Sequence, residues 1–330
     1  MSTSNTNPAT DAATTGSTAA NTTVRAAGSF VKGKVVVVTG SGGGIGRDFA
    51  LALAREGARV VVNDVGASIQ GEGNDPSRAQ AVVDEIRATG GEAIANGDSV
   101  ADWDAANRMI RQAVDSYGRI DAVINNAGIL RDRFFFNMSV EEWRSVIDVH
   151  LHGSFYVARA AAPFFKEQKS GSYIHMVSTS GLIGNFGQAN YSAAKLGVVA
   201  LSKSIAMDMA KFNVRSNCIS PFAWSRMIGS IPVETDEQKA RVERLQRMES
   251  AKIAPLAVYL ASDEAADVSG QIFAVRANEI FLMSQSRPLR SMHSSDGWTP
   301  QTVASRAMPA MKPSFYRLDR SQDVFDWDPV

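Results

Sequence analysis

Three residues could together carry out proton transfer: Ser178, Tyr191 and Lys195. Tyr191 and Lys195 are four positions apart, so on a helix their side chains share one face. A lysine ammonium beside a phenol favours the phenolate, and lowering the pKa of a phenol from about 10 to about 7 takes about 4 kcal/mol. Ser178 follows a strand-like run, and its hydroxyl can donate to a substrate oxygen. Such a set could exchange a proton with a carbinol oxygen while hydride moves elsewhere.

A tyrosine with a lysine at the fourth following position often arises by chance, so the pair alone is weak evidence for an active site. Of the six tyrosines in the chain, only Tyr191 has this spacing. The interpretation therefore depends on the elements that position the pair.

A glycine-rich turn lies between a buried strand and a helix early in the chain. Val35–Val38 is fully apolar, as in a central parallel strand, and the stretch from Thr39 to Gly46 contains five glycines. Helical spacing then continues to Glu56. A Gly-rich loop is often only a loop, but between a strand and a helix it lets the backbone approach a pyrophosphate at the helix N-terminus. We interpret it as a dinucleotide phosphate site.

Asp64 ends the next strand, about 20 residues after the glycines. A carboxylate there can accept both ribose hydroxyls of NAD and repel the 2′-phosphate of NADP. The alternative is an ordinary turn residue at a strand end. We favour the ribose-binding role.

Strands and helices alternate along the rest of the chain up to Val275. This pattern predicts one α/β domain, a Rossmann-type doubly wound parallel sheet of about seven strands with helices on both faces. Ligands of such sheets lie at the carboxyl ends of the strands, where Gly40, Asp64, Asp98, Asn125 and Ser178 fall. We expect a disordered tail over residues 1–30, the domain over 31–275, and an extension over 276–330 packed on the body or on a neighbouring subunit.

Composition narrows the possible partners. The 34 basic and 34 acidic residues balance, which argues against nucleic acid or an anionic membrane as a partner. No apolar run approaches the length of a membrane span. The single cysteine, Cys218, excludes an intrachain disulfide and fits a reducing compartment, so we expect a cytoplasmic protein. We predict no metal site.

Two helical stretches, Ser139–Phe165 and Tyr191–Ala210, are unusually apolar; the second half of the first, Phe155–Phe165, is apolar on nearly every face, and the second is similar. Helices of this kind are buried, so a partner subunit could cover them. We expect a homodimer or homotetramer. A charged segment, Asp236–Glu249, has the position of a lid over the substrate.

The chain strongly resembles the short-chain dehydrogenase/reductase family. The matching features are Thr39-Gly-x-x-x-Gly-Ile-Gly46, Asn125-Asn-Ala-Gly128, Ser178, and Tyr191-x-x-x-Lys195 thirteen residues after that serine. Within the family, it is most similar to the (3R)-hydroxyacyl-CoA dehydrogenase domains of type 2 peroxisomal multifunctional enzymes, also known as 17β-hydroxysteroid dehydrogenases of type 4, and to their free-standing bacterial relatives in sterol side-chain oxidation. That closer similarity involves the stretches Val62–Asp64, Gly128–Arg133, Val149–Phe155 and Gly184–Tyr191.

The resemblance implies a role for each matching residue. Tyr191 is the general acid and base, Lys195 lowers its pKa and holds the nicotinamide ribose, and Ser178 orients the substrate oxygen. Asp64 selects NAD. The remaining cofactor contacts implied are Gly40, Ser41, Gly44, Ile45 and Gly46 at the phosphates, Asp98 and Ser99 at the adenine, and Asn125, Ala127 and Gly128 along the cleft.

The sequence departs from the family at two positions. His150 stands where many members have an asparagine whose backbone supports a proton-relay water, and Pro221-Phe222 replaces the usual Pro-Gly after the sixth strand. The sequence therefore does not define the proton relay at His150 or the contacts between the Pro221-Phe222 loop and the nicotinamide.

The expected activity is NAD-dependent oxidation of a (3R)-hydroxyacyl-CoA to the 3-oxoacyl-CoA. Within enzymes, the alternatives are a 17β-hydroxysteroid dehydrogenase and a 3-oxoacyl-carrier-protein reductase, and Asp64 opposes the NADPH such reductases use. A catalytically silent NAD-binding protein is the alternative from another class, and the intact Ser178, Tyr191 and Lys195 argue against it. Arg131 and Arg133 could meet the anionic carrier of an acyl-CoA, or could be ordinary ion-paired surface residues.

Overall fold

The computed structural model describes residues 29–223 and 248–330. Within them, eight strands form a single sheet in the order β3-β2-β1-β4-β5-β6-β7-β8. All neighbours are parallel except β7 and β8, which are antiparallel. This confirms the predicted doubly wound sheet and adds one strand to it. The expected N-terminal tail and the lid segment lie almost entirely outside the described residues.

The strands are β1 (Val35–Thr39), β2 (Arg59–Asn63), β3 (Glu92–Asn96), β4 (Ala122–Asn125), β5 (Gly171–Met176), β6 (Val214–Phe222), β7 (Ile272–Arg276) and β8 (Glu279–Leu282). The longer helices are α1 (Gly44–Arg55), α2 (Ser77–Ala88), α3 (Trp103–Tyr117), α4 (Val140–Ile147), α5 (Gly153–Gln168), α7 (Ala189–Met209) and α9 (Ala254–Ala261). Short helices are η1 (Phe135–Asn137), η2 (Asp148–His152), α6 (Thr179–Leu182), η3 (Ala210–Phe212), η5 (Ser250–Ile253), η6 (Asp263–Ala265), α10 (Pro300–Thr302), η7 (Val303–Ala307), α11 (Met308–Met311), η8 (Lys312–Ser314) and α12 (Ser321–Val324).

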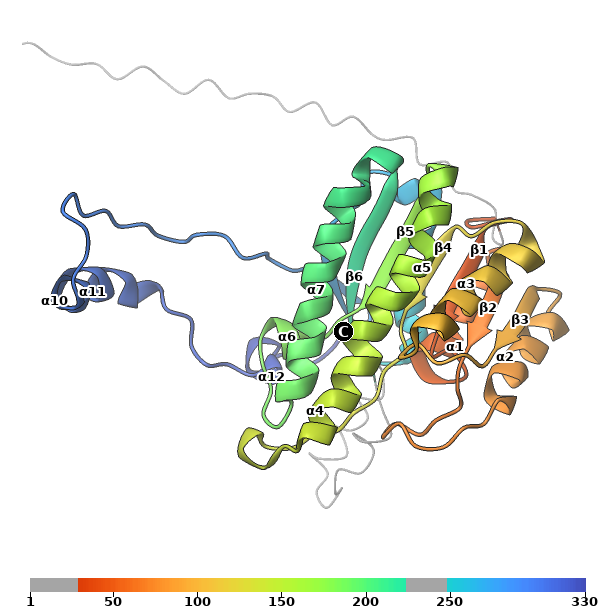
Figure 1. The fold of residues 1–330 in the computed structure, drawn as a ribbon, viewed down its shortest axis with the longest axis horizontal. Helices are drawn as coiled ribbons and strands as arrows, with labels where there is room; N and C mark the ends of the chain where they lie inside the picture. The colour runs from red at the N-terminus through yellow and green to blue at the C-terminus, as the bar shows by residue number, and fades with distance from the viewer. Residues whose placement is uncertain (1–28, 224–247) are drawn as a thin grey trace, which may run out of the picture.

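The apolar strands are buried because helices cover both faces of the sheet (Figure 1). Alternate residues of β1 point to opposite layers: Val36 and Val38 pack with α1, α2 and α9, whereas Val35 and Val37 pack with α3 and α5. The run of four valines therefore contributes side chains to the hydrophobic cores on both faces of the sheet. A third cluster joins α7 to β6 through Val198, Val199 and Cys218.

The long helix predicted from Ser139 is interrupted. Ser139 and Glu142 form the predicted capping box. After α4, a π-helical turn, η2, leads into α5 without a break in direction. Such turns shift the side chains that follow, and His150 lies on this one.

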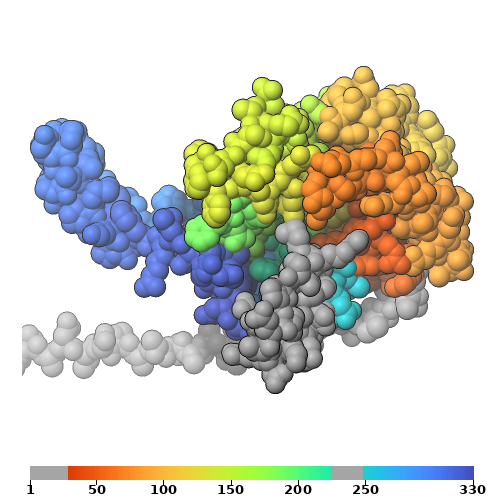
Figure 2. All heavy atoms as spheres, turned by 90° about the horizontal axis from the view of Figure 1, so that it is seen from below, coloured from red at the N-terminus to blue at the C-terminus, as the bar shows by residue number. Residues whose placement is uncertain are grey.

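The C-terminal extension makes a long excursion. After β8, the chain runs away from the body, carries α10, η7 and α11 at its far end, and returns to the body at α12 beside α6 (Figures 1 and 2). Leu289, Phe315, Tyr316 and Leu318 lie exposed along this excursion.

The single cysteine, Cys218, is buried in β6, and burial raises the pKa of its thiol to about 12.

None of the helices in the described ranges is long and apolar enough to cross a membrane.

Candidate active site

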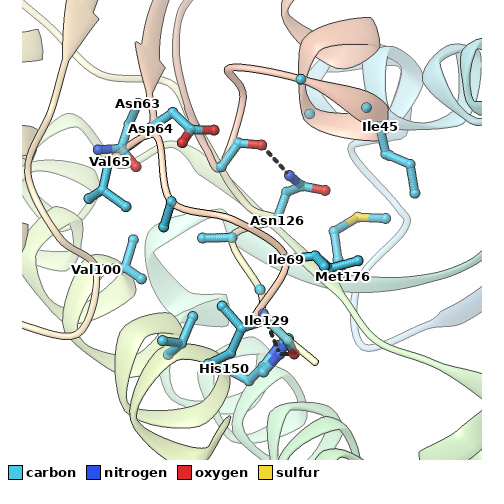
Figure 3. A pocket seen from close by; sticks show the side chains of 18 of the residues that line it. Ile45, Asn63, Asp64, Val65, Ile69, Val100, Asn126, Ile129, His150 and Met176 are labelled. Carbon is cyan, nitrogen blue, oxygen red and sulfur yellow. Dashed lines mark hydrogen bonds between the residues drawn. The ribbon is translucent and has the colours of Figure 1, made fainter. Parts of the chain in front are cut away.

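The cleft opens where the strand order reverses, between β1 and β4. It has a volume of about 510 Å³ and extends from the glycine turn past Asp64 and Asp98 to Tyr191 and Lys195. Figure 3 shows Asp64, Asn126 and His150 among the side chains that line it. This is the switch point at which doubly wound sheets bind their ligands. The topology therefore places the glycine turn and the tyrosine–lysine pair along one cleft.

Close backbone contacts shape the glycine turn. A Cβ on Gly46 would overlap the carbonyl oxygen of Gly40, and one on Gly40 would lie 2.7 Å from Ala127 Cα. Asn126 locks the turn from the β4 side, because its Nδ2 donates to the carbonyl oxygens of Thr39 (3.0 Å) and Gly40 (2.9 Å). The cradle is thus formed by two segments held together, and it fits a pyrophosphate at the start of α1.

Asp64 stands at the end of β2 with its carboxylate turned toward the cleft. Oδ2 accepts from the Gly42 N–H at 2.8 Å, and Oδ1 accepts from the Gly66 N–H at 2.7 Å. Each oxygen keeps a further lone pair for a ribose hydroxyl. Arg78 lines the same end of the cleft and is exposed. Arg78 belongs to no sequence motif; it lies on the first turn of α2, and the fold of the loop before α2 brings it to the same end of the cleft as Asp64.

Most predicted cofactor residues line the cleft, but two do not. Those that line it are Gly40, Gly44, Ile45, Gly46, Asp64, Asp98, Ser99, Ala127, Gly128, Tyr191 and Lys195. The Ser41 hydroxyl is fully buried and donates to the Val38 carbonyl oxygen at 2.7 Å. Asn125 is also buried, with its Nδ2 3.4 Å from the Ser154 carbonyl oxygen and 3.2 Å from His175 Nδ1. Their side chains thus hold the scaffold beneath the cleft.

Tyr191 and Lys195 line one end of the cleft, and Ser178 hydrogen-bonds to Tyr191 without lining the cleft itself. Ser178 caps α6, Tyr191 and Lys195 lie on successive turns of α7, and Lys195 Nζ is 5.6 Å from the centroid of the Tyr191 ring. Lys195 Nζ donates to the Met176 carbonyl oxygen at 2.6 Å. The shared helix face expected from the spacing is therefore present.

Burial governs the protonation equilibria of Tyr191 and Lys195. Burial raises the pKa of Tyr191, and the hydrogen bond with Ser178 opposes that rise. Burial also lowers the pKa of Lys195 to about 7. Desolvation penalises the charged forms of both groups, and Lys195 is not among the causes that shift the pKa of Tyr191, so a lowering of that pKa by Lys195 stays a prediction.

His150 occupies the wall next to Tyr191. The ring packs edge-on against the Tyr191 ring at 5.1 Å, and Nε2 lies 2.8 Å from the Ile129 carbonyl oxygen and 3.1 Å from the Ile129 nitrogen. A Cβ on Gly128 would overlap the imidazole. Burial lowers the pKa of His150 well below its usual value, so the ring is neutral. The side chain at this departure from the family pattern thus fixes the loop that follows β4.

A second cavity of about 580 Å³ lies beside the loop that precedes α7. Its walls include Phe134, Phe136, Ser180, Phe186 and Leu196. Within the wall, the Ser180 hydroxyl donates to Gln188 Oε1 at 2.8 Å, and the Ser180 N–H donates to Ser178 Oγ at 3.1 Å. The cavity is therefore largely apolar and linked by hydrogen bonds to the catalytic serine.

Both arginines considered for an anionic carrier have partners. Arg131 donates to the Gln70 carbonyl oxygen at 2.9 Å and lies 3.7 Å from Glu72. Arg133 donates to Glu142 at 3.0 Å. These contacts favour the ion-paired alternative. The described residues hold no group of three or more candidate metal ligands.

The sequence and the fold are both similar to those of known dehydrogenases. The family model described as short chain dehydrogenase matches residues 34–228. A short-chain type dehydrogenase/reductase of Mycobacterium tuberculosis is 45% identical over 76% of this chain and 84% of its own length. The crystal structure of a short chain dehydrogenase from Mycobacterium avium superposes with a TM-score of 0.76 and 39% identity, covering 87% of this chain and 97% of that one.

Two further relatives have more specific names. The peroxisomal multifunctional enzyme type 2 of Mus musculus is 43% identical over 82% of this chain, but the match spans only 36% of that enzyme. The hydroxyacyl-CoA dehydrogenase ChsB1 of Mycobacterium tuberculosis is 38% identical over 83% of this chain and 87% of its own length.

Proposed function

The chain belongs to the short-chain dehydrogenase family, and we propose that it oxidises a (3R)-hydroxyacyl-CoA to the 3-oxoacyl-CoA with NAD. The observation that carries the proposal is the pair Tyr191 and Lys195 at one end of the cleft, with Ser178 hydrogen-bonded to Tyr191 and a largely apolar cavity beside the loop before α7. The names of two relatives, the multifunctional enzyme and the hydroxyacyl-CoA dehydrogenase, support the substrate class.

The proposed mechanism divides the reaction between a proton and a hydride. When bound, NAD supplies the hydride acceptor for the hydrogen on the carbinol carbon. The Tyr191 phenolate takes the hydroxyl proton, and the Ser178 hydroxyl donates to the same substrate oxygen and holds it in place. Loss of the proton and the hydride together leaves the ketone. Lys195, in the same buried end of the cleft, stabilises the phenolate when it carries its own proton.

We propose NAD as the coenzyme because of Asp64. Family members generally use NAD or NADP. The Asp64 carboxylate faces the ribose end of the cleft and can accept from both hydroxyls. The exposed Arg78 guanidinium at the same end works in the opposite direction, since it could attract a 2′-phosphate.

We propose that the acyl chain, for which a sterol side chain is one candidate, lies in the cavity beside Phe134, Phe136 and Phe186. Aromatic walls of this kind bury apolar ligands without demanding one shape. We also propose that the enzyme works in the cytoplasm as a homodimer or homotetramer.

A substrate panel tests the proposal. The purified enzyme is mixed with NAD and, in turn, (3R)- and (3S)-hydroxyacyl-CoA esters of several chain lengths and free 17β-hydroxysteroids, and NADH absorbance is followed. We expect the highest kcat/KM for a (3R)-hydroxyacyl-CoA. A higher value for a free steroid would establish the steroid alternative. Faster reduction of a 3-oxoacyl-carrier protein with NADPH would establish the reductase.

A further inference from the structure

The last twelve residues of the chain, 319–330, contact two separate parts of the body. We call this segment the C-terminal clasp. At one end it meets the edge of the sheet at β7 and β8, and at the other it meets the loop 183–188 between α6 and α7. Figure 1 shows α12 next to α6, far along the chain from it. The clasp therefore links the sheet edge to the segment that leads to Tyr191.

Arg276 anchors the clasp to the sheet. This side chain is only 3% exposed, and its guanidinium lies 4.5 Å from the Trp327 ring centroid. It donates to the Trp327 carbonyl oxygen at 2.9 Å and to Glu279 at 2.9 Å. Phe325 packs against Phe222 with ring centroids 4.9 Å apart. A buried arginine needs such partners, so the clasp is an integral part of this edge.

Ser321 anchors the clasp to the loop. Its N–H donates to the Gly184 carbonyl oxygen at 3.0 Å, and its hydroxyl reaches the same oxygen at 3.2 Å. The Arg320 guanidinium lies 5.7 Å from the centroid of the Phe186 ring. On its other side, the loop is held by the Arg133 N–H, which donates to the Gly187 carbonyl oxygen at 2.8 Å. Two main-chain hydrogen bonds from distant segments thus fix the loop.

The same loop forms a wall of the apolar cavity and ends at Gln188, the residue that caps α7. Gln188 accepts from Ser180 at 2.8 Å, and its Nε2 donates to Asp132 at 2.8 Å. Ser180 in turn donates its N–H to Ser178. A shift of the loop would therefore move the cavity wall and the partners of the catalytic serine, and would leave the phosphate cradle unchanged.

We propose that the C-terminal clasp is a positioning element for the substrate cavity, acting through Ser321 on the loop 183–188. Neither Ser321 nor the loop 183–188 lines the cofactor cleft, and no residue of the clasp takes part in proton transfer. A test of this proposal by enzyme kinetics rests on the proposed function, whereas a test by amide hydrogen exchange of the loop does not.

Ser321→Pro is the sharpest variant. Ser321 is the first residue of α12, where proline is tolerated, and Arg320 before it has φ −88° and ψ 164°, which a following proline accepts. The change removes the N–H that holds Gly184. Ser321→Ala is the matched control, because it removes only the longer hydroxyl contact. A second pair compares Phe325→Ala in the clasp with Phe315→Ala, which is 59% exposed on the excursion.

Amide hydrogen exchange of peptides covering 180–190 is measured for all four variants, together with NADH binding and steady-state kinetics. We expect exchange in Ser321→Pro and Phe325→Ala to be about three- to tenfold faster, as loss of one hydrogen bond predicts. In Ser321→Pro, KM for the alcohol substrate should rise by a similar factor with NADH affinity unchanged, because neither Ser321 nor the loop 183–188 lines the cofactor cleft. Exchange unchanged in both clasp variants, or equally faster in both controls, would overturn the proposal. Faster exchange without turnover of any acyl-CoA would uphold it and reject the proposed substrate.

Discussion

Replacing Asp64 should shift the coenzyme preference toward NADP, and the structure indicates by how much. The carboxylate is fixed by the N–H groups of Gly42 and Gly66, so it stands ready for the ribose hydroxyls. A Cβ built on Gly42 would lie 2.9 Å from Arg78 Cβ and 3.0 Å from Asp64 Cβ. Both side chains therefore start next to Gly42, and the Arg78 guanidinium extends to the Ala67 carbonyl oxygen (3.3 Å) and Asp75 (3.9 Å).

The two coenzymes respond differently to loss of the charge. For NAD, Asp64→Ala removes two charge-assisted hydrogen bonds, each contributing about 1.5 kcal/mol at a half-exposed site, so kcat/KM should fall about 100-fold. For NADP, the repulsion between two unit charges about 4 Å apart is about 1 kcal/mol in water and about 4 kcal/mol at a partly buried site. An intermediate value of about 2 kcal/mol gives a gain of about 30-fold.

Asp64→Asn separates charge from hydrogen bonding. The amide oxygen can still accept from one glycine N–H, so the turn keeps part of its support. This variant should show the same gain with NADP and a smaller loss with NAD, about tenfold. Adding Arg78→Ala to Asp64→Asn should remove most of the gain in kcat/KM with NADP, because the Arg78 guanidinium that could attract the 2′-phosphate is then absent.

The assay is the rate of reduced coenzyme formation with a fixed alcohol substrate and varied NAD or NADP. Thermal melting of each variant with and without coenzyme controls for loss of folding. The reasoning is refuted if the unaltered enzyme already has equal or higher kcat/KM with NADP, or if Asp64→Asn leaves the ratio of the two coenzymes unchanged.

Three further predictions concern the catalytic pair and the assembly. Tyr191→Phe should lower turnover by about 10²–10⁴-fold while NADH fluorescence reports unchanged binding; activity within a few-fold of the unaltered enzyme would show that another group is the base. Because burial lowers the folded-state pKa of Lys195 from 10.5 to about 7, the unfolded chain binds more protons between these values, so the free energy of unfolding should rise from about pH 7 to about pH 10.5. Lys195→Met should weaken this dependence in urea titrations and raise stability at neutral pH while abolishing turnover; an unchanged pH slope would contradict the assignment. Met207→Glu, at a side chain 74% exposed on α7, should convert the proposed dimer or tetramer to monomer by light scattering, whereas a monomeric unaltered protein would contradict the proposed assembly. Val199 is unsuitable as that probe, because it is only 9% exposed and packs in the core.

The sequence predicts the sheet well because the strands that form its centre are unambiguous. A run such as Val35–Val38 can be stable only with apolar layers on both sides, and the glycines after it mark a turn. β8 was not predicted. It follows β7 through Ala277 and Asn278, and Ala277 adopts φ +52° without being glycine, so the usual signature of a tight turn is missing.

Within the site, the predictions succeed where a local motif fixes geometry and are incomplete where burial decides. Tyr191 and Lys195 share a helix face because their spacing requires it. Their pKa values depend on how much water the surrounding segments exclude, which no spacing reveals. Ser41 lies within the glycine motif, but its side chain turns into the core because the Val38 carbonyl oxygen is its nearest partner. Arg78 and the C-terminal clasp reach the site from outside every motif.

The buried thiol of Cys218 has a practical consequence. It is the only cysteine of the chain, it is 1% exposed, and burial holds its pKa near 12, so at neutral pH it is neither accessible nor nucleophilic. A maleimide dye or spin label will therefore react only with a cysteine introduced on the surface. Phe186→Cys, at a side chain 73% exposed on the loop 183–188, would place a single label at the cavity wall, and the native Cys218 could stay in place. Movements of that wall could then be followed by fluorescence or spin resonance in otherwise unmodified protein.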